Sequence, residues 1–133
     1  MSTTVSHTTR SFPRLSYEKV KNDILGSEYE LSLVFVGEKR GREINRQSRN
    51  KTYVPNVLSF PLSSKAGEIY ITLAVAKREA PTFRHSYPKH VLYLFIHGLL
   101  HLKGLDHGSK MDMLEEKYLR NSLKTYANSK KRT

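Results

Sequence analysis

The chain has 133 residues, which is enough for one ordinary domain and leaves little room for a second. It contains no cysteine, which excludes a disulfide framework and a thiolate metal site and favours a cytoplasmic location. The formal net charge of +11 favours a polyanionic partner, nucleic acid before anionic membrane, although general solubility is an alternative explanation. The longest apolar run, 91–102, is interrupted and too short to cross a bilayer, so we expect no membrane contact.

The first half of the chain predicts short strands alternating with short helices. The N-terminal segment 3–8 is either an edge strand or disordered, and Ser16 is a candidate N-cap for a helix that Gly26 ends. Apolar spacing predicts a helix at 17–25, and apolar runs predict a buried strand at 31–36 and strands at 57–60 and 68–72 joined by a hairpin-like loop. Between them, 38–49 is a polar stretch with helical spacing of its arginines, and after them come a short helix candidate at 73–79 and a connection rich in Pro, His and Arg over 81–88.

The helix predicted at 38–49 carries a basic stripe. Arg42, Arg46 and Arg49 recur at intervals of four and three residues, which places them on one helical face. Such a face suits the phosphates of a nucleic acid, and a simple solvated face is the alternative.

The second half of the chain predicts helices alone. Pro88 suits the first turn of a helix that runs to about 103 and ends at Gly104, and its apolar residues leave no polar face, so we expect it to be buried. Ser109 is the candidate cap of a last helix at 110–126, and the basic tail from Asn128 is expected to be loose. The chain therefore predicts one α+β domain, 1–127, in which a small mixed β-sheet packs against helices around the central buried helix, followed by the tail 128–133.

Three histidines in the second half have the spacing of a metal site. His97 and His101 lie four residues apart on one face of the buried helix, and His107 follows after Gly104 has reversed the chain. Histidines on an apolar helix are often hydrogen-bonded core residues, but two unpaired rings in a core are costly, and one metal ion satisfies both. Three imidazoles with an open fourth position are typical of catalytic zinc.

The residues around these histidines narrow the chemistry. The spacing equals that of the zinc-protease signature H-E-x-x-H-x-x-G-x-x-H, but Gly98 stands where those proteases have their general base, which disfavours peptide hydrolysis. A basic protein with this site suits phosphodiesters better. His90 lies seven residues before His97 in the first helical turn, where we expect solvent contact, and we interpret it as a surface or supporting residue and not as a ligand.

The segment from His97 to His107 resembles the H-G-x-L-H-L-x-G-x-D-H signature of the bacterial YbeY family of endoribonucleases and rRNA maturation factors, and it matches every defining position. The resemblance covers roughly residues 30–119. It includes Asn45, Arg46, Gln47, Arg49, the Val-Leu-Ser-Phe-Pro run at 57–61, Gly67, Glu68, Ile69, Met111, Leu114 and Glu115.

The resemblance implies a single α+β domain with one Zn²⁺ per chain on His97, His101 and His107. It also implies cleavage of single-stranded RNA in maturation of the 16S rRNA 3′ end and in ribosome quality control. Arg49 matches an invariant arginine of the family that faces the substrate channel. The implied partners are rRNA and the small ribosomal subunit, with a ribosome-assembly GTPase as a further candidate.

The chain departs from the family pattern near the cleft. Pro55 and Asn56 stand where the family usually has Thr-Asp, Glu68 replaces an Asp, and the acidic loop after His107 is shortened. We expect these changes to alter the lining of the cleft and the loop contacts, and not the metal.

The mechanism that follows is a hypothesis with one open step. Zinc would acidify a water and polarise the scissile phosphate, Arg49 would stabilise the developing charge, and Lys39, Arg42 and Arg46 would steer the RNA. No residue stands out as general base, so either water or the RNA 2′-hydroxyl attacks.

The sequence alone leaves open the roles of two residues and the choice between three functions. Asp106 and Met111 are expected to support the site or the fold, Asp106 either by orienting an imidazole or by capping a helix. The alternative functions are a ribosome-assembly or RNA-binding factor with a structural metal and, less favoured, a divergent metalloprotease.

Overall fold

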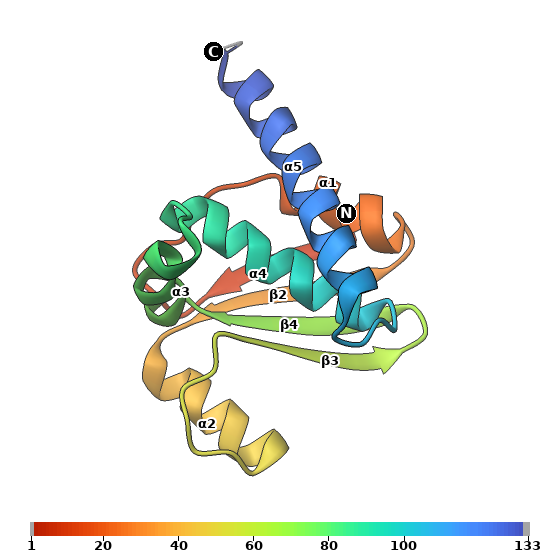
Figure 1. Cartoon of the computed structure of the whole chain (residues 1–133). Helices are drawn as coiled ribbons and strands as arrows, with labels where there is room; N and C mark the ends of the chain where they lie inside the picture. The colour runs from red at the N-terminus through yellow and green to blue at the C-terminus, as the bar shows by residue number, and fades with distance from the viewer. Residues whose placement is uncertain (1, 132–133) are drawn as a thin grey trace.

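The computed structural model describes residues 2–131, and the side chains of 2–124 within that range. The described part has four strands and five α-helices (Figure 1). In chain order the elements are β1 Thr3–His7, α1 Tyr17–Leu25, β2 Glu30–Val36, α2 Glu38–Arg49, β3 Val57–Ser63, β4 Ala66–Thr72, α3 Leu73–Glu79, the 3₁₀ helix η1 Ala80–Phe83, α4 Tyr87–Leu102 and α5 Ser109–Lys131. Helices α1, α2 and α3 have the predicted bounds.

The four strands form one mixed sheet in the order β1-β2-β4-β3. Strand β2 pairs in parallel with both β1 and β4, and β3 pairs antiparallel with β4. Register pairs Leu33 with Ile69, so that these two side chains lie on the same face of neighbouring strands. The prediction of a small mixed sheet packed against helices in one α+β domain is confirmed.

Helices cover the two faces of the sheet unequally. Helix α4 crosses one face, flanked by α1 and α5, whereas α2 lies on the other side of the sheet (Figure 1). The main core lies between the sheet and the helices on the α4 side, and Phe95 and Leu99 of α4 have no exposed surface. A smaller apolar cluster of Val36, Ile44 and Leu58 attaches α2 to the opposite face. The expected central buried helix is therefore α4.

The N-terminal segment is the edge strand that the sequence left open against disorder. It pairs with β2 in parallel, from Thr3 opposite Leu31 to His7 opposite Phe35. The hydroxyls of Ser2 and Thr3 also donate to the carboxylate of Glu18, at 3.0 and 3.1 Å. These contacts join β1 to α1.

The last helix differs from its prediction. Helix α5 continues to Lys131, so the tail from Asn128, which we expected to be loose, is helical as far as the structure describes it. The physical reason is the absence of glycine and proline after Gly108, because without a breaker a helix can extend past its last core residue. Among the described helices, none is both long and apolar enough to span a membrane.

Candidate metal centre

Helix α4 and the turn after it bring the three histidines together. The ring centroids of His97 and His101 lie 4.6 Å apart, and that of His107 lies 5.2 and 4.8 Å from them. Each residue offers one ligand atom within 4.8 Å of the others, so that the three could hold one metal ion. Gly104, with a φ of 104°, makes the turn that returns His107 toward α4.

Hydrogen bonds fix which nitrogen of each α4 histidine faces the centre. The Leu105 carbonyl can only accept, so Nδ1 of His101, 3.1 Å away, donates to it. Nδ1 of His97 likewise donates to Oε1 of Glu115 at 3.2 Å. With this tautomer, each ring points the lone pair of Nε2 inward.

The distance between the two inward-facing Nε2 atoms fits a cation between the rings. The two Nε2 atoms of His97 and His101 lie 3.1 Å apart, where two lone pairs repel each other in the absence of a proton or a metal. Tetrahedral zinc with Zn–N bonds of about 2.0–2.1 Å places ligand nitrogens about 3.3 Å apart. Burial, and then the charges of His97 and His107, lower the pKa of His101, which favours the neutral ring that a metal requires. The donor set therefore fits a metal ion.

Glu115 of α5 supports the site from behind His97. It is buried at 4% exposure and accepts hydrogen bonds from His97 and from the Tyr93 hydroxyl. Burial by itself raises the pKa of Glu115, but the bonds and charge of His97 and the bond from Tyr93 lower it overall. Glu115 was given no role from the sequence alone. A signal was present, because Glu115 lies four residues after Met111 on the apolar face of its helix.

Close packing of α4 on the sheet explains why residue 98 is glycine. A Cβ at this position would lie 2.9 Å from Oγ of Ser59 and 3.0 Å from Cδ1 of Ile69, both in the sheet beneath α4. The Ser59 hydroxyl donates to the Gly98 carbonyl at 3.2 Å, which binds β3 to the helix. A side chain at residue 98 would therefore point into the sheet and not toward the histidines, so this fold has no room for a protease-type base there.

The three histidines line an open cleft of about 580 Å³. Its other walls come from the loop before β3 and from β3 itself, together with Arg49 at the end of α2. The Arg49 guanidinium donates to Oδ1 of Asn45 at 3.3 Å and to the Tyr53 hydroxyl at 3.0 Å, which holds the arginine at the cleft. Its positive charge thus faces the same space as the imidazoles.

The rest of the basic stripe lies outside this cleft. Lys39, Arg42 and Arg46 are exposed along α2 and do not line the cleft. These three residues form a basic surface on α2, whose last residue is Arg49. Of the residues that we expected to alter the cleft, Asn56 lines it, whereas Glu68 lies on β4 and lines two other grooves.

Asp106 and Met111 lie in different surroundings. Asp106 is exposed, and its carboxylate makes no hydrogen bond with a described histidine, whereas Met111 is 1% exposed and packs in the main core.

The expectation of solvent contact for His90 is wrong, because its side chain is fully buried and bonded to Glu79 at 2.8 Å. The 3₁₀ helix η1 and the residues after it cover the first turn of α4 and exclude water from His90, whose ring lies 4.8 Å from that of Phe83.

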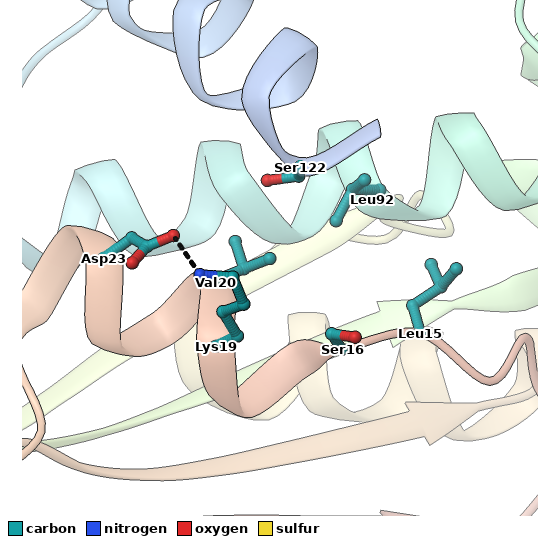
Figure 2. Close-up of a pocket in the computed structure, with 7 residues that line it drawn as sticks. All are labelled: Leu15, Ser16, Lys19, Val20, Asp23, Leu92 and Ser122. Carbon is teal, nitrogen blue, oxygen red and sulfur yellow. Dashed lines mark ion pairs between the residues drawn. The ribbon is translucent and has the colours of Figure 1, made fainter. Parts of the chain in front are cut away.

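A second hollow between α1, α4 and α5 is a poor candidate for a site. Leu15, Val20 and Leu92 line it with a Lys19–Asp23 ion pair of 3.9 Å at its edge (Figure 2). Its volume of about 20 Å³ holds about one water, and none of its lining residues is a histidine or an arginine. The cleft beside the three histidines is the better candidate.

Comparison with known proteins agrees with this geometry. The family model described as "Endoribonuclease YbeY" matches residues 3–128. Endoribonuclease YbeY of Mycoplasma capricolum is 35% identical over 112 residues, covering 69% of this chain and 68% of the relative. That of Helicobacter pylori is 40% identical over 97 residues, covering 70% and 69%. The solution structure of TM1509 from Thermotoga maritima has the same fold, with a TM-score of 0.69, 24% identity and coverage of 96% and 93%. The chain belongs to the YbeY endoribonuclease family.

Proposed function

We propose that this protein is a zinc-dependent endoribonuclease that cleaves single-stranded RNA during maturation of the 16S rRNA 3′ end and in ribosome quality control. The observation that carries the proposal is the convergence of three imidazoles and Arg49 on one open cleft. A net charge of +11 attracts a polyanion to the protein, and Arg49 supplies positive charge at the cleft itself. The small ribosomal subunit and a ribosome-assembly GTPase are the proposed partners.

Each group has a defined role in this proposal. His97, His101 and His107 would hold one zinc ion, which when bound supplies a Lewis acid for the phosphate and an acidified water. Glu115 and the Leu105 carbonyl keep two of these rings in the correct tautomer. Arg49 binds the scissile phosphate and stabilises its developing charge, while Lys39, Arg42 and Arg46 bind the flanking backbone.

The proton of the nucleophile has no carboxylate to receive it within the cleft. Among described residues, the cleft is lined by arginine, tyrosine, asparagine, serine, apolar and histidine side chains, with no aspartate or glutamate. This observation favours a second candidate function, an RNA-binding ribosome-assembly factor whose metal stabilises the fold and whose cleavage is weak.

One experiment separates the two functions. We would quantify bound metal and then compare wild type, His101→Ala and Arg49→Ala on a single-stranded fragment from the 3′ end of small-subunit rRNA. Arg120→Ala on the exposed side of α5 is the charge-matched control for Arg49→Ala. The nuclease proposal expects cleavage by wild type and the control, and loss of cleavage in both site variants with the fold retained.

The result that contradicts the nuclease is a wild-type protein with stoichiometric zinc that binds this RNA and leaves it intact. The assembly factor would then be the better account. The chemistry of the product ends identifies the nucleophile, because attack by the 2′-hydroxyl leaves a 2′,3′-cyclic phosphate and cannot occur on a 2′-deoxy substrate.

A further inference from the structure

A chain of four hydrogen-bonded side chains leads from the buried start of α4 to the wall of the cleft. We call His85, His90, Glu79 and Asn56 the polar chain. Nδ1 of His85 lies 3.0 Å from Nδ1 of His90, and Nε2 of His90 lies 2.8 Å from Oε2 of Glu79. That same oxygen accepts from Nδ2 of Asn56 at 3.1 Å, and Oε1 lies at 3.4 Å. The polar chain joins the cleft wall to the core.

Burial makes the inner part of the polar chain rigid. The side chain of His90 has no exposed surface, and its ring stacks against Tyr93 with centroids 5.5 Å apart. Because a carboxylate only accepts, Nε2 of His90 must donate to Glu79, which fixes the position of that carboxylate. Glu79 thus stands at a fixed place behind Asn56.

Asn56 is consequently held in one orientation of its amide. Its Oδ1 accepts from the backbone N–H of Val57 at 2.7 Å, while its Nδ2 faces Glu79. A flipped amide would set oxygen against the carboxylate and NH₂ against an N–H, so both contacts select the same orientation. An amide nitrogen carries two hydrogens, and Asn56 lines the cleft that contains the histidines. Its second N–H bond is suited to an acceptor bound in that cleft.

We propose that Asn56 is a substrate-binding residue that donates a hydrogen bond to a phosphate oxygen of the RNA, and that Glu79 and His90 are positioning residues for its amide. This inference rests on the proposed RNA substrate. With Glu79 behind it, an aspartate would place an oxygen at the site now held by Nδ2, 3.1 Å from a carboxylate oxygen. Two carboxylates at that distance share a proton or move apart.

A double variant at positions 56 and 79 keeps the net charge and can separate an effect on RNA binding from an effect on folding. In the double variant Asn56→Asp with Glu79→Gln, the glutamine carbonyl can accept from His90 and its NH₂ can donate to Asp at position 56. The other aspartate oxygen can still accept from the Val57 N–H. The contacts with His90 and the Val57 N–H keep their direction, and only the contact between positions 56 and 79 is reversed, at the place of Oε1, which now lies 3.4 Å from Nδ2 of Asn56. The net charge is unchanged, but position 56 presents only acceptors to the cleft.

The test measures binding of a fluorescent single-stranded RNA to the metal-free protein by anisotropy, alongside thermal unfolding. Asn56→Ala should weaken binding about tenfold, the loss expected for one hydrogen bond to a charged group. Glu79→Gln should weaken it about threefold through a looser amide, whereas Glu116→Gln, an exposed charge-matched control on α5, should not weaken it. The double variant should unfold at a higher temperature than Asn56→Asp alone and bind RNA at least about tenfold more weakly than wild type.

The proposal is overturned if the double variant binds RNA as tightly as wild type, or if wild type does not bind the RNA. Unchanged binding by Glu79→Gln together with weaker binding by Asn56→Ala overturns the positioning role of Glu79. Since binding is measured without metal or cleavage, a protein that binds through Asn56 but never cleaves would contradict the nuclease and leave this inference standing.

Discussion

Replacement of Glu115 by glutamine tests how the metal centre is supported. Glutamine keeps the shape of the side chain and one acceptor for Nδ1 of His97, now 3.2 Å from the carboxylate, but it removes the charge. The loss of charge assistance at a site only 4% exposed should cost about 1–2 kcal/mol of folding free energy. Loss of a carboxylate partner of a ligating histidine typically lowers metal affinity 10–100-fold, or about 1.4–2.7 kcal/mol.

The assay pairs urea unfolding of the metal-free protein with a zinc titration against a chromophoric chelator. Glu116→Gln is the matched control, because its side chain is 76% exposed and its ion pair, with Arg120 at 3.4 Å, lies at the surface. We expect both quantities to fall for Glu115→Gln and to stay within error for the control. If Glu115→Gln binds zinc and resists urea as wild type does, the carboxylate does not orient His97.

The pH dependence of the same pair of proteins has a defined sign. Because the pKa of Glu115 is lowered from its ordinary value of 4.5, the ionised carboxylate stabilises the folded state above that value. The contribution is lost as pH falls through the lower folded value. The difference in unfolding free energy between wild type and Glu115→Gln should therefore be constant above about pH 5 and shrink below pH 4.5.

Three more perturbations address the fold and the metal. Gly98→Ala should lower the free energy of unfolding by about 1–3 kcal/mol in urea despite the better helix propensity of alanine, and an unchanged midpoint would contradict the close packing on Ser59 and Ile69. Phe95→Ala should cost about 3–5 kcal/mol because the ring is fully buried, and a loss below about 1 kcal/mol would show that the core collapses to fill the space. A chelator should lower the melting temperature and added zinc should restore it, whereas equal melting curves with and without chelator would mean that no metal binds the folded state.

Local pattern predicted much of the fold. The apolar residues of α4 leave no polar face, which identified the buried helix, and helices α1, α2 and α3 have the bounds predicted from the sequence. The grouping of His97, His101 and His107 followed from helical spacing and one glycine turn, since all three lie within eleven residues.

Contacts between distant segments were beyond such patterns. Glu115 reaches His97 from another helix, and Glu79 reaches Asn56 across a separation of 23 residues, so no local period reveals either contact. His90 was misplaced because its position in a first helical turn suggests solvent, whereas η1 folds over it. The N-terminal strand depends on a parallel partner nearly thirty residues away, which a short β-branched run does not specify.

The hydrogen bond between Ser59 and Gly98 joins residues 39 positions apart, and it bears on the time at which the site forms during synthesis. The basic helix α2 and the strand that carries Ser59 leave the ribosome well before α4, and Glu115 follows later still. Long-range contacts of this kind close slowly, after the local helices have formed. A nascent chain would therefore carry the positive charge of α2 before the three histidines and Glu115 are in place.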